Sequence, residues 1–166
     1  MYIHWKPQQA GLILTSDTKL LSVLYEQHND TFNDYTKLHD VAEPVKTSIY
    51  NFIDAAGSVA IAVDCENSDP FKLYSVIKGL DADEMAKINK LSLYDDANTT
   101  FAWDWLGKYL HIPVEHIEVE RVVGHKSLVD IKMAVCVSRD YYENRIDSFI
   151  LFSSDSDFWG LISSMR

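Results

Sequence analysis

The sequence predicts an α/β fold with a mainly parallel sheet, helices on both of its faces, and a helical N-terminal extension. From residue 58 onward, strand-like apolar segments alternate with amphipathic segments four times, which is typical of a parallel sheet covered on both sides. The first strand-like segment is a nearly continuous apolar run, as expected for a strand buried on both faces. Residues 1–57 lack this alternation and contain stretches with helical spacing instead.

The extension is predicted to be helical in two stretches, residues 18–27 and 41–55. Their apolar side chains need a partner, and the α/β core is the nearest one available. We therefore expect two parts in the chain: an extension of residues 1–57 packed on the core, and an α/β domain of residues 58–166.

The α/β domain begins with "SVAIAVD" at residues 58–64, which is rich in valine, isoleucine and alanine and predicts a buried strand. A helix is expected next, because Ser68 or Asp69 can cap it and Pro70 suits its first position. Gly79 is typical of a helix end. This segment forms the first strand and helix unit.

The next two strands are predicted at residues 88–96 and 114–123, where apolar and polar positions alternate. Residues 97–110 lie between them and carry apolar side chains at helical spacing. The fourth strand is predicted at residues 146–154, and another helix begins at residue 158.

A longer helix is expected before the fourth strand. Leu128, Ile131 and Val135 recur there at three- and four-residue spacing, which predicts that they share the helix's apolar face.

Composition narrows the classes of function. The net charge of −10 argues against a broad nucleic-acid-binding surface, but it is compatible with carboxylates that bind a metal ion, which in turn meets a phosphate. Cys65 and Cys136 lie far apart among apolar neighbours, which predicts buried reduced thiols rather than a zinc site. The sequence contains neither an apolar run of membrane length nor a signal peptide pattern, so we expect a cytoplasmic protein.

Four aspartates are predicted to meet at one edge of the sheet. Asp64 ends the first strand, Asp155 and Asp157 follow the fourth, and Asp130 lies in the first turn of the helix before it. Ligands bind at the carboxyl ends of parallel strands, and clustered carboxylates repel one another unless a cation such as Mg²⁺ or Mn²⁺ neutralises them. Each acid taken alone also suits a cap or a turn, so the residues by themselves leave open a metal site and solvated strand ends.

Three blocks of sequence resemble the signature blocks of NYN domains, which belong to the PIN-like nuclease superfamily. They are "VDCEN" at 63–67, "KSLVDIKM" at 126–133 and "SSDSDFWGLI" at 153–162. The resemblance covers residues 58–166 in the expected order. It implies a three-layer α/β/α sandwich and a metal-dependent ribonuclease that uses Mg²⁺ or Mn²⁺.

The resemblance also implies roles for individual residues. It assigns the catalytic and metal-binding roles to Asp64, Asp130, Asp155 and Asp157. It assigns substrate binding to Asn67, Lys126 and Ser154, with Lys126 as a phosphate contact. The family's domain continues into a further strand after the last helix, so truncation of the domain at its C-terminal end is kept open. Residues 1–57 lie outside the resemblance, which therefore implies nothing about their structure or function.

Other residues have both a functional and a structural interpretation. Trp103, Trp105 and Trp159 could stack on bases, but their size and spacing favour core positions. Asp95 and Asp96 could flank the site from the second strand, although a turn role suits them equally well.

The function that the sequence favours is cleavage of RNA phosphodiester bonds by a metal-activated water. The alternative is a non-catalytic PIN-like module that binds RNA or a protein. A phosphatase of the haloacid dehalogenase type is disfavoured, because "DCENS" carries glutamate (Glu66) instead of the second aspartate two positions after Asp64. RNA is the expected partner and a membrane is not, whereas a homo-oligomer or a protein partner stays open.

Overall fold

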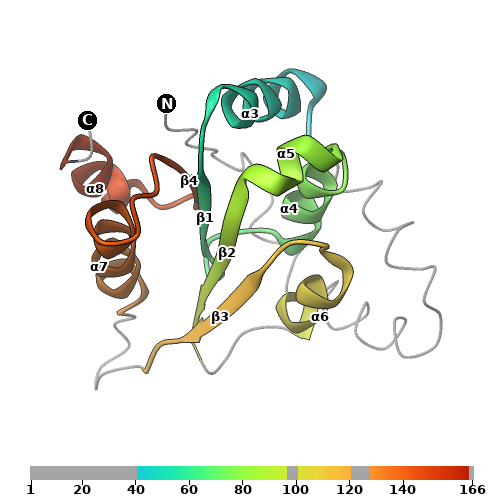
Figure 1. The fold of residues 1–166 in the computed structure, drawn as a ribbon. Coiled ribbons are helices and arrows are strands. Elements are labelled where there is room, and N and C mark those ends of the chain that lie inside the picture. The colour runs from blue at the N-terminus through green and yellow to red at the C-terminus, as the bar shows by residue number, and fades with distance from the viewer. Residues whose placement is uncertain (1–40, 97–100, 121–127, 165–166) are drawn as a thin grey trace.

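The computed structural model describes residues 41–96, 101–120 and 128–164, and it contains a four-stranded parallel sheet (Figure 1). The strands are β1 (Val59–Asp64), β2 (Ile88–Asp95), β3 (Val114–Glu118) and β4 (Ser148–Phe152). The predicted parallel sheet is therefore confirmed. β3 and β4 are shorter than their predicted ranges, 114–123 and 146–154.

The order of the strands in the sheet is β3-β2-β1-β4. β1 is central, and its Ile61 lies opposite Leu91 of β2 and Ile150 of β4. The chain steps outward from β1 to β2 and β3, and then returns to the other side of β1 to add β4. The direction of winding thus reverses between β1 and β4, and open α/β sheets bind ligands beyond the carboxyl ends of strands at such a point.

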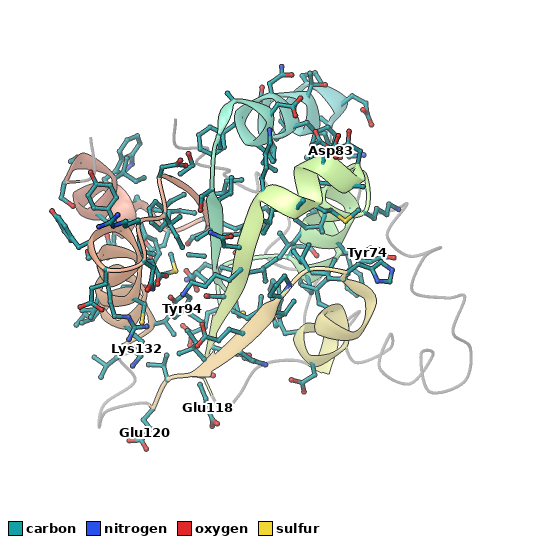
Figure 2. The ribbon with its side chains drawn as sticks, viewed as in Figure 1. Tyr74, Asp83, Tyr94, Glu118, Glu120 and Lys132 are labelled. Carbon is teal, nitrogen blue, oxygen red and sulfur yellow. The ribbon has the colours of Figure 1, made fainter. Side chains whose placement is uncertain are left out.

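Helices cover both faces of the sheet, as the three-layer sandwich requires (Figure 1). One layer contains α3 (Glu43–Ala55), α4 (Pro70–Ile77), α5 (Ala82–Lys87) and α6 (Phe101–Tyr109), and the other contains α7 (Val129–Tyr142) and α8 (Trp159–Ser164). Alternate residues of β1 serve the two layers, since Ile61 packs with α3, α4 and α6, while Ala60 and Ala62 pack with α7 and α8. Figure 2 shows Tyr94 of β2 on the α7 side.

The start of α4 follows its predicted capping. The Asp69 carboxylate accepts hydrogen bonds from the backbone N–H groups of Phe71 (2.9 Å) and Lys72 (3.4 Å), and Pro70 occupies the first helical position. The short helix α5 was not predicted. It begins at a capping box in which Asp81 and Glu84 satisfy each other's backbone N–H groups.

The predicted apolar face of α7 is wrong for Ile131 and Val135, whereas Leu128 packs against the core as predicted. Ile131 and Val135 are 63% and 62% exposed, whereas Val129, Met133 and Val137 are buried against the sheet. The helix carries apolar side chains on more than one side, so spacing alone cannot decide which side meets the sheet. That choice is made by packing on the small side chains of β1.

Several smaller predictions can also be compared with the structure. Cys65 and Cys136 are free and buried, as predicted, and burial raises the pKa of the Cys65 thiol, which keeps it protonated. Residues 41–55 form α3 as expected, whereas the stretch 18–27 lies outside the described residues. None of the described helices is long and apolar enough to cross a membrane.

A close approach between α3 and the end of α4 depends on Gly79. A Cβ atom at this position would collide with the hydroxyl group of Tyr50, which donates a hydrogen bond to the carbonyl oxygen of Val76 (3.0 Å). Glycine is therefore required here because a helix from the N-terminal part of the chain packs against this turn.

We expect Gly79→Ala to lower the free energy of unfolding by about 1–3 kcal/mol, since the added methyl group displaces the Tyr50 ring. The same change in a Tyr50→Phe background should have a smaller effect, because the colliding oxygen is gone. Gly160→Ala in α8 is the control, since a Cβ there meets nothing within 4 Å. Urea unfolding measures all four variants, and equal losses for Gly79→Ala in both backgrounds would contradict this account.

Candidate active site

Three carboxylates gather at the carboxyl end of β4. Asp130, Asp155 and Asp157 each offer an oxygen atom, and these atoms all lie within 4.8 Å of one another. Asp130 comes from the first turn of α7, and the other two belong to the turn that leads from β4 into the 3-10 helix η1 (Ser156–Phe158). We call these three residues the acid group. Asp130 and Asp155 are partly buried and Asp157 is exposed.

Asp155 also shapes the turn that carries the acid group. It caps η1, because its carboxylate accepts a hydrogen bond from the backbone N–H of Asp157 (2.9 Å). One carboxylate oxygen therefore holds the backbone of the next acid in place. The "DSD" spacing in the sequence thus produces a local turn and brings both acids to the same site.

Asp64 lies deeper than the acid group and is not a member of it. It is fully buried at the end of β1, and both of its oxygens accept hydrogen bonds. Oδ1 accepts from the backbone N–H of Asn67 (3.3 Å), and Oδ2 accepts from Asn67 Nδ2 (2.9 Å) and Ser153 Oγ (2.7 Å). A buried carboxylate needs such donors, because water cannot solvate it.

Ser153 connects this buried carboxylate to the acid group. The Ser153 hydroxyl donates a hydrogen bond to Asp64 and accepts one from the backbone N–H of Asp155 (3.0 Å). Ser153 is only 3% exposed. Sequence reasoning missed this residue. The available signal was a serine two positions before an aspartate, a spacing that commonly places a hydroxyl on the later backbone N–H.

Further hydrogen bonds join the loops that follow β1 and β4. Ser154 donates twice to the carbonyl oxygen of Asn67, from its backbone N–H (3.1 Å) and from its hydroxyl (2.9 Å). Ser68 donates from its hydroxyl to the carbonyl oxygen of Phe152 (2.8 Å). Asn67 and Ser154, both assigned to substrate binding by resemblance, therefore hold the two loops together here. Lys126 lies outside the described residues.

Burial and neighbouring charges disfavour ionisation of two carboxyl groups at the site, those of Asp64 and Asp130. The pKa of Asp64 is raised, first by burial and last by the charge of Asp155, although the bonds from Ser153 and Asn67 lower it. The pKa of Asp130 is raised by burial and then by the charges of Asp64, Asp155 and Asp157. A cation would relieve this repulsion. Three carboxylates with no nitrogen or sulfur donor among them form a set of ligands that suits Mg²⁺ or Mn²⁺.

Asp95 belongs to a different cluster on the opposite face of the sheet. Its carboxylate lies 2.9 Å from Nε2 of His116, whose Nδ1 lies 3.3 Å from Asp104. This arrangement joins β2, β3 and α6. Asp95 and Asp96 are both buried, at 1% and 3% exposure, so neither is a solvated turn residue.

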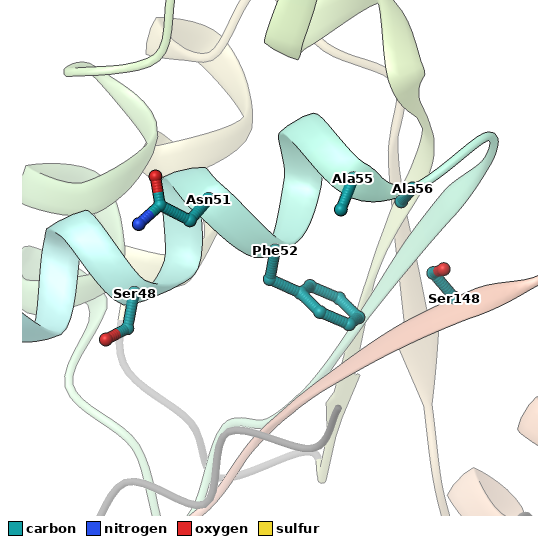
Figure 3. A pocket seen from close by; sticks show the side chains of 6 residues that line it. All are labelled: Ser48, Asn51, Phe52, Ala55, Ala56 and Ser148. Atoms are coloured by element: carbon teal, nitrogen blue, oxygen red, sulfur yellow. The ribbon is translucent and has the colours of Figure 1, made fainter.

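A hollow of about 400 Å³ lies away from the acid group (Figure 3). It is lined by Ser48, Asn51, Phe52, Ala55, Ala56 and Ser148. Ser148 begins β4, whereas the acid group follows the end of that strand. The hollow contains no titratable side chain and therefore offers no chemistry for a reaction.

The sequence left open whether the tryptophans are core residues or exposed residues that could stack on bases. Trp103 is 2% exposed and belongs to the core, as favoured. Trp159 is 50% exposed, so its predicted core position is wrong. The spacing misled because Phe158 and Ile162 supply the buried contacts of this segment. The side chain of Trp105 lies outside the described residues.

Comparison with protein families gives one match. A family model described as NYN domain matches residues 52–166, a range that contains the whole sheet and the acid group. No significant match was found among curated proteins or among solved structures.

The raised pKa values of Asp64 and Asp130 predict how stability depends on pH without metal. The folded state keeps protons on these groups above their unfolded pKa, near 3.8, so the free energy of unfolding should fall as pH rises from about 4 through the raised values. Asp130→Asn should flatten this slope and be more stable than the wild type at neutral pH. Urea unfolding in a chelator across this range measures the effect, and identical slopes would contradict it.

We expect Ser153→Ala to lower the free energy of unfolding by about 1–3 kcal/mol, because it removes one of the three donors to the buried Asp64 carboxylate and the hydroxyl that accepts the Asp155 backbone N–H. It should also raise the pKa of Asp64 further, since the lost hydrogen bond lowers that pKa. Ser156→Ala, an exposed position in the same turn, is the matched control. Urea unfolding and titration of the carboxyl signals by NMR are the measurements. An effect no larger than that of the control would argue against the connecting role of Ser153.

Proposed function

Because the chain belongs to the NYN domain family of PIN-like nuclease domains, we propose that it is a metal-dependent ribonuclease that hydrolyses RNA phosphodiester bonds. The observation that carries this proposal is the acid group at the switch point between β1 and β4. Carboxylate oxygens from the first turn of α7 and from the turn into η1 converge there, which suits a metal ion that activates water.

The acid group would hold Mg²⁺ or Mn²⁺ through Asp130, Asp155 and Asp157. When bound, such an ion lowers the pKa of water and neutralises charge on the phosphate. Asp64 would contribute negative charge from its buried position behind the acid group. Its hydrogen bonds with Ser153 and Asn67 hold the loops after β1 and β4 together.

The residues of the acid group differ in how far solvent reaches them, and this suggests different tasks. Asp157 is exposed, so its carboxylate can accept a proton from an attacking water and release it to solvent. Asp155 is partly buried and uses one oxygen to hold the η1 backbone, so it orients the group. Asp130 is fixed by its place in the first turn of α7.

A non-catalytic module that binds RNA or a protein is the alternative. Three carboxylates without a cation repel phosphates, so a protein that only binds RNA would gain by losing them. The intact acid group therefore supports catalysis. We place this activity in the cytoplasm, where thiols such as those of Cys65 and Cys136 stay reduced.

Asp155→Asn tests the proposal. Asparagine keeps the capping oxygen of η1 but removes a charge from the acid group, so the protein should fold while cleavage of single-stranded RNA with Mg²⁺ or Mn²⁺ falls about 100-fold or more. A chelator should abolish cleavage by the wild type. Asp147→Asn, just before the opposite end of β4, should cut RNA at the wild-type rate. Wild-type cleavage by Asp155→Asn would refute the proposed site.

A further inference from the structure

The outer face of α7 combines exposed apolar side chains with cations. Ile131, Val135 and Tyr142 are 63%, 62% and 77% exposed, and their spacing places them on one side of the helix. We call these three residues the outer stripe. Lys132 and Arg139, two helical turns apart, are exposed beside it and form the cation row.

The cation row differs from several other lysines of the protein. Lys46, Lys87 and Lys90 each make an ion pair with a carboxylate. Within the ranges that the structure describes, Lys132 and Arg139 make none. These two charges therefore remain available to a ligand, in a chain whose net charge of −10 repels polyanions elsewhere.

Both rows begin in the same turn of α7 as Asp130 but on other sides of the helix, about 100° around its axis for the outer stripe and about 160° for Lys132. Asp130 directly precedes Ile131 and Lys132 in the first turn of α7, and the outer stripe extends about 16 Å along the helix from there. Figure 2 shows Lys132 at the end of α7 from which the helix starts. A ligand at the acid group therefore has to pass around the first turn of α7 before it can follow the outer stripe along the helix.

Resting on the proposed function, we propose that single-stranded RNA runs from the acid group along α7. Its phosphates lie on Lys132 and Arg139, and its unpaired bases lie against Ile131, Val135 and Tyr142. A single strand presents phosphates and base faces side by side, which matches two parallel rows of cationic and apolar side chains. A duplex hides its base faces and cannot use the outer stripe.

A second copy of the chain fits this face less well. In a symmetric dimer through α7, the same patch meets itself, so Lys132 and Arg139 of both copies would lie close together. Unpaired like charges disfavour such a contact, whereas phosphates neutralise them. The charge of the cation row therefore selects RNA as the occupant.

Fluorescence anisotropy with a labelled single-stranded oligouridine RNA tests this path. A chelator is present, so that no cleavage is needed or takes place. The double variant Lys132→Ala/Arg139→Ala should bind at least about fivefold more weakly, and the slope of log affinity against log salt should fall by about 1.4 for two lost phosphate contacts. Lys78→Ala, an exposed lysine directly after α4 on the other layer, is the matched control and should bind like the wild type.

Tyr142 tests the contact with bases separately. Tyr142→Ala should weaken binding about fivefold or more while leaving the salt slope unchanged, and Tyr142→Phe should bind like the wild type because it keeps the ring. The same RNA annealed to its complement should be insensitive to Tyr142→Ala.

Wild-type affinity and salt slope in the double variant would overturn the path along α7. So would a dimer, measured by sedimentation equilibrium, that Val135→Asp abolishes while RNA affinity stays unchanged. The ribonuclease proposal fails by a different result, namely no metal-dependent cleavage by the wild type. The path along α7 stands in that case if the α7 variants still lose RNA binding.

Discussion

The burial of one carboxylate organises the loops that carry the candidate site. Asp64 ends the central strand with no solvent access, so its oxygens must be satisfied by protein donors. Asn67 supplies two of them from its own loop, and Ser153 supplies the third from the end of β4. The same serine receives the backbone N–H of Asp155. The position of Asp155 therefore depends on a buried carboxyl group that solvent does not reach.

Much of the architecture could be predicted from the sequence, because a parallel sheet repeats one simple pattern. Apolar runs that end in acids, alternating with amphipathic segments, were enough to place the strands and to bring Asp130, Asp155 and Asp157 together. The separate position of Asp64 was not predictable, since spacing places a residue at a strand end without giving its depth or its hydrogen-bond donors. The prediction for Ile131 and Val135 failed for a related reason. α7 has apolar residues on two sides, and only packing decides which side faces the sheet.

The acid group brings three carboxylates together, and a cation bound there would change how this surface interacts with a polyanion. Without a cation the acid group repels a polyanion, whereas under the proposed function a bound ion would attract RNA to the same carboxylates. Cations on α7 lie one helix face away from these carboxylates and make no pair with the described acids. The exposed cations of α7 and the carboxylates of the acid group therefore lie on neighbouring but separate surfaces.

The hydrogen bond between Asp64 and Ser153 joins residues 89 positions apart in the chain. Contacts of such long sequence separation form only after the segments between them have been ordered, because closing a long loop has an entropic cost. No local fragment of this fold contains the acid group together with the carboxylate that supports it. A partly folded or clipped chain that has lost β4 therefore lacks an assembled acid group, and under the proposed function its RNA cleavage would report on the completeness of the whole sheet.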